Sequence, residues 1–308
     1  MPDFLPSWDT HDVDSLREFA KIRLIAVDLD GTLLRVPGAS IPPSIERLQR
    51  KLKRYRHIKL TVATGRALAG AASLAEHLGI EKEIPIVVYN GSLVVLPRVR
   101  RLLAIRYIPN AALKTIIEIG RQMQLDVLAY YCQPTGAWDS GIVEEEVLGW
   151  SKKSKSTLDF NGLPIRWCSE VDDAGGRDSV AALIDVRANL KVVAELKSML
   201  TQVDGISCTQ STPTFVEVRP MGSNKAAGLQ SVAEFLGLSS NQVLALGDND
   251  NDIEMLKWAG IGVVVAGSSA GATATSRFLC RHGVVSGVVE ALDLVHQANR
   301  YYHLESPG

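Results

Sequence analysis

Two aspartates, one residue apart, end an apolar run near the start of the chain. The run IRLIAV leads directly into Asp28 and Asp30, and Gly31 and Thr32 follow. Acidic side chains are poor strand residues and are costly to bury, so a strand that ends on two of them suggests a chemical role. Carboxylates can bind Mg²⁺, attack phosphorus and transfer protons. The pair is therefore the first candidate for a reactive site.

Two more apolar runs end on polar residues, and one predicted helix begins near a lysine. These residues are Thr64, Gly65 and Arg66 in VATGR, Asp248, Asp250, Asn251 and Asp252 in LALGDNDND, and Lys225 in SNKAAG. Ligands of an open parallel sheet bind outside the carboxyl ends of its strands. We therefore expect these separated segments to converge on one crevice.

Each of these residue types has a use in phosphoryl transfer. Asp28 and Asp248, placed about 4 Å apart, would repel by on the order of 4 kcal/mol at an effective dielectric of about 20. Mg²⁺ would remove that penalty. The Thr64 hydroxyl, nearby backbone N–H groups and the Lys225 ammonium could hold a phosphate. Asp28 could then attack phosphorus, while Asp30 could protonate the leaving oxygen and activate water.

Strand and helix patterns alternate in the first third of the chain. Buried strands are predicted at 22–28, 58–65 and 84–91, and helices at 41–54 and 67–79 separate them. This βαβαβ order predicts parallel strands joined by right-handed crossovers. The fold class is therefore α/β, with a Rossmann-like parallel-sheet core.

The pattern changes after the third strand and returns near the C-terminal third of the chain. Mixed strand and helix patterns fill the middle, and buried strands and helices of the first kind follow them. We expect a catalytic core made of residues 1–91 and 216–308. An α+β cap domain, residues 92–215, is expected to be inserted in it.

The composition and net charge of the chain limit the kinds of partner that we expect it to bind. The chain has 308 residues, a formal net charge of −1 and 46% hydrophobic residues, the balance of an ordinary globular protein. The basic stretch 47–59 keeps apolar residues at helical spacing, which favours a solvated helix face over a nucleic-acid groove. The chain starts without a signal-peptide pattern, its four cysteines form no metal motif, and no apolar stretch is as long as a membrane span. We expect a cytoplasmic protein, monomeric or homodimeric, with neither a nucleic-acid nor a membrane partner.

The four motifs, taken in order, resemble those of the haloacid-dehalogenase-like superfamily of phosphotransferases. DLDGT resembles its first motif, Thr64 of TGR its second, Lys225 its third and GDNDND its fourth. The insertion between the second and third motifs resembles that of the Cof-type sugar-phosphatase branch, whose members carry a large α/β cap. The resemblance covers about residues 22–91 and 216–265. It implies a phosphatase acting on a small phosphorylated metabolite, a sugar phosphate, with a cap that closes over the sugar.

The resemblance also implies roles for the acidic residues. Asp28 would be the nucleophile and Asp30 the general acid and base. Mg²⁺ would be held by Asp28, the Asp30 carbonyl and Asp248, with support from Asn251 or Asp252. We take Asp252 as the fourth metal-binding residue.

Three further residues are candidates for contact with the phosphate or substrate: Gly65, Arg66 and Asn251. Arg66 could equally form a salt bridge within the protein. The chain departs from the family pattern in AGSSAGATATS and CRHGVVSGVVEAL, which supply none of the motif residues. The resemblance therefore does not predict which residues make contacts around the mouth of the site.

Three other functions use similar residues. A receiver domain also has a phosphorylated Asp, a Thr and a Lys, but its phosphorylated Asp ends a later strand and it has no inserted domain. A phosphotransferase or mutase would pass the same aspartyl phosphate to another acceptor. A catalytically silent protein would only bind the phosphometabolite. Asp30, placed to activate water, favours hydrolysis.

Overall fold

A computed structural model gives the three-dimensional structure of the chain. The description that follows is confined to residues 2–7, 16–35, 44–135, 142–151, 156–159, 161–186, 189–210 and 213–304. Contacts between residues divide the chain into two compact units. The first unit comprises residues 1–64, 74–86 and 229–308, and the second comprises residues 65–73 and 87–228. The domain boundaries at residues 92 and 215 stay a prediction.

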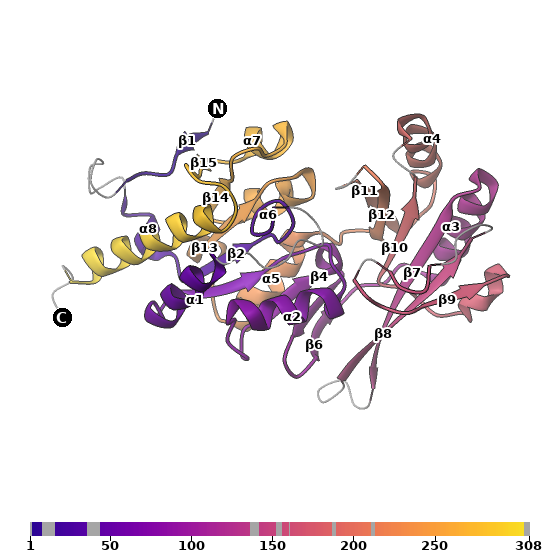
Figure 1. Cartoon of the computed structure of the whole chain (residues 1–308), viewed down its shortest axis with the longest axis horizontal. Helices are drawn as coiled ribbons and strands as arrows, with labels where there is room; N and C mark the ends of the chain where they lie inside the picture. Colours follow the sequence, from indigo (N-terminus) through magenta and orange to yellow (C-terminus); the bar gives the residue numbers. More distant parts are fainter. Residues whose placement is uncertain are drawn as a thin grey trace. The chain divides into compact units, whose positions relative to one another are not determined.

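A parallel sheet forms the centre of the first unit (Figure 1). Among the described residues its strand order is β1-β15-β14-β13-β2-β3, and every pairing in it is parallel. The strands are β1 (Asp3–Phe4), β15 (Phe278–Leu279), β14 (Ile261–Val264), β13 (Val243–Gly247), β2 (Leu24–Val27) and β3 (Lys59–Val62). The central strands β2, β13 and β14 are buried along their whole length, as expected for apolar runs covered on both faces.

Helices of the first unit surround this sheet or connect its strands. They are η2 (Phe19–Lys21), α1 (Ile45–Arg54), η5 (Ser240–Gln242), η6 (Asp250–Asp252), α6 (Ile253–Trp258), α7 (Ala270–Thr275) and α8 (Val284–Leu304). Helices α2 (Leu68–Leu78) and α5 (Lys225–Phe235) are divided between the units, and their first residues belong to the second. The beginning of the helix expected at 41–54 lies outside the described residues. The parallel, Rossmann-like core predicted from the sequence is confirmed.

A mixed sheet forms the second unit. Its strand order is β11-β12-β10-β7-β8-β6-β5-β4, and β9 pairs in parallel with β8. The strands are β4 (Ile86–Val88), β5 (Leu93–Leu96), β6 (Arg101–Ile105), β7 (Asp126–Thr135), β8 (Ile142–Trp150), β9 (Ile165–Cys168), β10 (Ala181–Asp185), β11 (Ile206–Thr209) and β12 (Phe215–Pro220). The short helices η3 (Tyr89–Gly91) and η4 (Val171–Ala174) lie in its connections.

Two long helices, α3 (Asn110–Met123) and α4 (Leu190–Leu200), pack side by side against this mixed sheet (Figure 1). Alternate residues of β7, namely Val127, Ala129 and Tyr131, face a core that includes Ile116 of α3 and Leu196 of α4. The period of two is that of a strand with one face turned to a core. The predicted α+β character of the inserted segment is confirmed.

One expected strand needs correction, and one further strand was missed. The strand expected at 84–91 is shorter, and it joins the mixed sheet beside β5 instead of the parallel sheet. An apolar run predicts that a strand is buried, but it does not predict which sheet the strand joins, because both sheets bury such runs. Strand β8 was not predicted at all, since its sequence IVEEEVLGW carries three consecutive glutamates and acidic residues disfavour strands.

The described part of the chain contains no helix that is both long and apolar enough to cross a membrane.

The C-terminal helix α8 is fastened to α1 by a cluster of polar and aromatic side chains. Lys51 forms an ion pair with Asp293 at 2.6 Å, and the Tyr55 hydroxyl lies 3.3 Å from the same carboxylate. The ring of His296 stacks on Tyr55, with centroids 3.6 Å apart, and its Nδ1 lies 3.4 Å from His57 Nε2. Helix α8 thus packs against α1.

This cluster gives folding a dependence on pH. Burial, helped by the positive potential of His57, Arg300 and Arg54, lowers the pKa of His296 to about 4. An unfolded histidine titrates near 6.5, so between these values the unfolded chain binds the proton more readily than the folded one. Stability should therefore fall as the pH drops from about 6.5 towards about 4.

We predict that His296→Phe, which keeps a ring against Tyr55 but cannot titrate, loses less stability than the wild type over this interval. Urea unfolding midpoints at pH 7.5 and pH 5 would measure the difference. Equal losses in the two proteins would show that His296 does not contribute to the pH dependence.

Candidate functional site

Parallel register brings the two most informative aspartates to the same edge of the sheet. Val27 of β2 lies opposite Leu246 of β13. Each strand ends within one residue of that pair, so Asp28 and Asp248 follow adjacent strand ends. The backbone N–H of Asp28 continues the ladder by donating to the Leu246 carbonyl at 3.0 Å. This is the crevice edge at which ligands of open parallel sheets bind.

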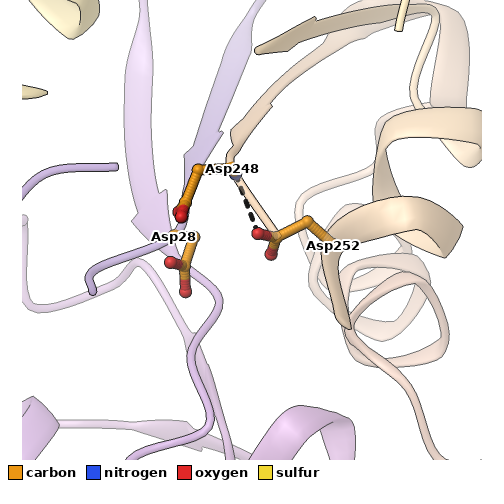
Figure 2. A group of neighbouring side chains, drawn as sticks. All are labelled: Asp28, Asp248 and Asp252. Carbon is orange, nitrogen blue, oxygen red and sulfur yellow. Dashed lines mark hydrogen bonds between the residues drawn. The ribbon is translucent and has the colours of Figure 1, made fainter. Parts of the chain in front are cut away.

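A third carboxylate joins them from the turn after β13. One oxygen each of Asp28, Asp248 and Asp252 lie within 4.8 Å of one another. Figure 2 shows the three carboxylates facing a common point, two from strand ends and one from η6. Asp28 and Asp252 are buried, with 4% and 0% of their surfaces exposed. We call these three residues the carboxylate group.

Hydrogen bonds hold two members of the carboxylate group in place. The Asp252 carboxylate accepts hydrogen bonds from the backbone N–H groups of Asp248 and Asn249, both at 3.0 Å. The Thr32 hydroxyl donates to Asp248 Oδ1 at 2.7 Å. The turn after β13 therefore folds back on its own aspartate, and the turn after β2 orients the Asp248 side chain.

Two glycines make room for this arrangement. Gly31 has a φ of +102°, and a Cβ there would lie 2.1 Å from Asp248 Oδ2. A Cβ at Gly247 would lie 2.6 Å from the Asp252 side chain. Any other residue at Gly31 would meet both a strained backbone and a blocked space. Glycine at position 31 is thus favoured by the approach of Asp248 as well as by the turn.

The carboxylate group is suited to a hard cation. At an effective dielectric of about 20, two charges about 5 Å apart repel by roughly 3 kcal/mol, and three carboxylates make three such pairs. A divalent ion bound by oxygen ligands relieves this repulsion, and Mg²⁺ and Ca²⁺ prefer such ligands. The donor set therefore fits a divalent metal.

Three other predicted residues belong to the same unit. Thr64 is buried two residues beyond β3, the strand next to β2, and Asn251 is buried beside Asp252 in η6. Asp30 is partly exposed in a tight turn, where the Gly31 N–H donates to the Leu34 carbonyl at 2.7 Å. Within the part of the chain that the structure describes, the carboxylate group does not include the Asp30 side chain.

The remaining predicted residues, Gly65, Arg66 and Lys225, belong to the second unit. Lys225 is fully buried at the first position of α5. Lysine is almost never fully buried unless it is paired, so its burial marks the position as unusual. Contact of these three residues with a phosphate stays a prediction.

Two residues near the carboxylate group were not identified from the sequence. Thr32, noticed only as a neighbour of the aspartates, orients Asp248. Ser269 lies in the atypical AGSSAGATATS segment, where its N–H donates to the Asp248 carbonyl at 2.7 Å and its hydroxyl donates to Asp250 at 2.6 Å. A serine that caps a helix, as Ser269 caps α7, is the signal that could have drawn attention to it.

The glycine at position 31 gives a direct test of this geometry. We predict that Gly31→Ala weakens Mg²⁺ binding at least tenfold, because the new Cβ displaces the Asp248 carboxylate. Calorimetric titration with Mg²⁺ would measure the affinity, and thermal unfolding the stability.

Gly79→Ala is the matched control. Gly79 also has a positive φ, +75°, but a Cβ there meets nothing within 4 Å. Both alanines carry the backbone strain, roughly 1 to 2 kcal/mol, and only one carries the clash. Equal metal affinities in the two variants would contradict the close approach of Asp248 to Gly31.

Comparisons with known proteins assign the family. The family model for haloacid dehalogenase-like hydrolases matches residues 25–292. The 5-amino-6-(5-phospho-D-ribitylamino)uracil phosphatase YcsE of Bacillus subtilis is 27% identical over 288 residues, which cover 90% of this chain and 96% of that protein. A phosphoglycolate phosphatase of Natronomonas pharaonis is 27% identical over 274 residues, covering 87% and 96%.

Solved structures agree with this assignment. A haloacid dehalogenase-like hydrolase from Bacteroides thetaiotaomicron superposes with a TM-score of 0.71 at 26% identity, covering 88% of this chain and 98% of that one. The subclass IIB sugar phosphatase BT4131 shares the fold, with a TM-score of 0.67 at 17% identity over 92% and 99% of the two chains. The chain therefore belongs to the haloacid dehalogenase-like hydrolases and is an enzyme of that family.

Proposed function

We propose that the protein is a Mg²⁺-dependent phosphatase that hydrolyses a small phosphorylated metabolite through an aspartyl phosphate on Asp28. The observation that carries the proposal is the carboxylate group at adjacent strand ends, in a chain of a hydrolase family. Two relatives with similarity over nearly the whole chain bear the names of phosphatases, which supports this reaction.

Asp28 is the proposed nucleophile. One of its oxygens forms a bond to phosphorus while the bond between phosphorus and the leaving oxygen breaks. Asp30, two residues on in the tight turn, donates a proton to that leaving oxygen. It then takes a proton from a water molecule, whose oxygen attacks phosphorus and releases Asp28 and inorganic phosphate. The acid of the first step is thus the base of the second.

Other residues are proposed to bind Mg²⁺ and the negatively charged phosphate. Asp28, the Asp30 carbonyl, Asp248 and Asp252 would hold Mg²⁺, which when bound would offset negative charge on the phosphoryl group. The buried Thr64 hydroxyl and the Lys225 ammonium are proposed to bind phosphate oxygens. We expect Gly65, Arg66 and Asn251 to complete the phosphate and substrate contacts.

A sugar phosphate is the proposed substrate class. The named relatives act on a phosphoribitylamino compound and on phosphoglycolate, both small organic phosphates by their names. A screen of sugar phosphates, with nucleotides and pyridoxal phosphate as contrasts, tests the proposal by release of inorganic phosphate with and without EDTA. Transfer of phosphate to an acceptor other than water would indicate a phosphotransferase or mutase. Unchanged ligand would indicate a binding protein.

Replacing the nucleophile gives the sharpest prediction. Asp28→Asn keeps the shape of the side chain but removes the attacking charge and one metal ligand. We predict a loss of activity of several orders of magnitude with the fold retained, measured as kcat with the best substrate and by circular dichroism. Asp293→Asn, on α8 and paired with Lys51, is the control and should keep near wild-type activity. An active Asp28→Asn enzyme would refute the assignment.

The second metal-binding aspartate should behave differently. Asp248→Asn leaves the nucleophile in place but removes a charged ligand, so we predict at least a tenfold rise in the Mg²⁺ concentration that gives half-maximal activity. Titration of activity with Mg²⁺ measures the change. An unchanged titration curve would exclude a ligand role for Asp248.

A further inference from the structure

A left-handed turn follows β4, and the predicted phosphate-binding segments of the second unit pack around it. Tyr89, Asn90 and Gly91 all have positive φ, at 50°, 51° and 93°. Such a conformation is unfavourable for residues with a Cβ, so neighbouring contacts must hold it. We call residues 89–91 the left-handed turn.

One side of the left-handed turn contacts the segment that contains Gly65 and Arg66. The Tyr89 N–H donates to the Arg66 carbonyl at 3.0 Å. A Cβ at Gly65 would lie 3.0 Å from the Asn90 side-chain nitrogen, so this glycine leaves room for the turn. The position of Arg66 therefore depends on the position of the turn.

The other side contacts the residues just before Lys225. A Cβ at Gly91 would lie 1.9 Å from the Asn224 carbonyl oxygen, so the two backbones are in direct contact. The hydroxyls of Ser92 and Ser223 are 3.0 Å apart. The left-handed turn thus supports both predicted phosphate-binding segments of this unit.

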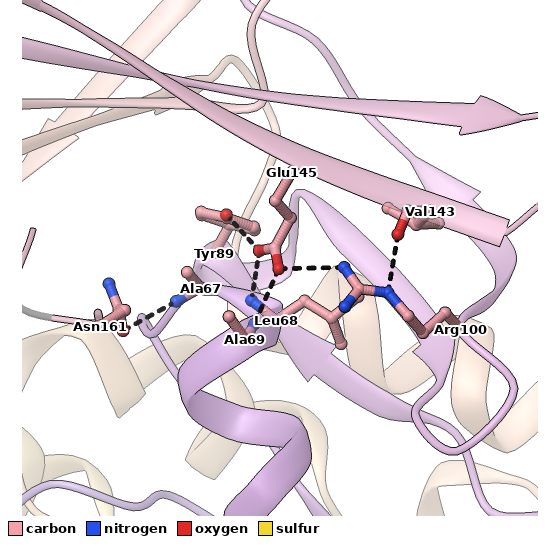
Figure 3. A network of polar contacts seen from close by, with 8 residues as sticks. All are labelled: Ala67, Leu68, Ala69, Tyr89, Arg100, Val143, Glu145 and Asn161. Carbon is pink, nitrogen blue, oxygen red and sulfur yellow. Dashed lines mark hydrogen bonds and ion pairs between the residues drawn. The ribbon is translucent and has the colours of Figure 1, made fainter. Parts of the chain in front are cut away.

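The buried carboxylate of Glu145, on β8, connects the left-handed turn to the start of α2. The Glu145 side chain is 2% exposed, and it accepts hydrogen bonds from the Tyr89 hydroxyl at 2.6 Å and from the N–H groups of Leu68 and Ala69 at 2.7 and 2.8 Å. Figure 3 shows Glu145 reaching from β8 to the turn and to the first residues of α2 at once. Leu68 lies two residues after Arg66, and the Tyr89 N–H donates to the Arg66 carbonyl, so Glu145 binds residues on both sides of the Arg66 backbone.

The charge of Glu145 is well compensated. The N–H groups at the start of α2 favour an anion, and Arg100 lies 3.3 Å from the carboxylate while its Nε donates to the Val143 carbonyl at 2.7 Å. Burial, with the nearby Cys132 and Glu145, raises the pKa of Tyr89, so the phenol keeps its proton and acts as the donor. Hydrogen bonds to a charged acceptor are about twice as strong as neutral ones.

We propose that Glu145 is a positioning residue for phosphate binding, which fixes Arg66 through the start of α2 and the Lys225 segment through the left-handed turn. The inference rests on the proposed phosphatase function. It adds a residue of the inserted segment, about 80 positions from Arg66 in sequence, to the determinants of substrate affinity.

Glu145→Gln tests the proposal. The glutamine removes the charge and replaces one of the two acceptor oxygens with an NH₂ group, so at least one donor at the start of α2 or on Tyr89 faces another donor. We expect KM to rise at least tenfold while kcat changes less than threefold, because ground-state phosphate binding is weakened. The Mg²⁺ titration should be unchanged. Calorimetry with inorganic phosphate should show the same loss of affinity without turnover.

Glu146→Gln is the matched control. Glu146 is the next residue of β8 and pairs with Arg166 and Arg177 at 3.2 and 2.6 Å, so it loses ion pairs of its own. We expect its KM to stay within twofold of the wild type. Loss of folded protein alone would lower the apparent kcat at constant KM, so unfolding can be distinguished from weaker phosphate binding, which raises KM.

Tyr89→Phe decides the question if Glu145→Gln does not fold, since it removes only the hydroxyl donor. A threefold or larger rise in KM is expected for it. A KM within twofold of the wild type in an active Glu145→Gln enzyme, or in Tyr89→Phe where only that variant folds, would overturn the proposal. So would an equal rise in Glu146→Gln. A wild-type protein that neither hydrolyses phosphate esters nor binds phosphate would instead overturn the proposed function.

Discussion

Mutual repulsion of the carboxylates of Asp28, Asp248 and Asp252 is the constraint on which the site depends. Their oxygens lie within 4.8 Å of one another, at the edge of a sheet whose central strands are fully buried. Apolar strands cannot themselves balance three negative charges, and the hydrogen bonds to Asp248 and Asp252 balance them only in part. Such a group is therefore suited to holding a divalent cation.

The scaffold supplies this group through backbone register more than through local sequence. Parallel pairing of β13 with β2 sets the ends of two strands side by side, and the turn after β13 returns Asp252 to the N–H groups at its own start. Gly31 removes the side chain that would keep Asp248 away. The site is thus a product of packing, in which small residues matter as much as charged ones.

Much of this could be predicted from the sequence, because polar residues directly after buried strands point to one edge of a parallel sheet. Asp28, Asp248 and Asp252 were singled out on that basis, and the structure brings their carboxylates together. The place of β4 in the mixed sheet could not be predicted, since its composition equals that of a parallel strand. Glu145 escaped notice because its partners, Leu68 and Ala69, are more than 70 residues away, so no local pattern marks its burial.

Anomalous diffraction from crystals soaked in Mn²⁺, a substitute for Mg²⁺ with the same preference for oxygen ligands, would show directly whether the carboxylate group binds a divalent metal. We expect a strong peak within bonding distance of Asp28 and Asp248 oxygens, on the side of the group that faces Asp252. A peak elsewhere, with none at the carboxylate group at saturating Mn²⁺, would contradict it.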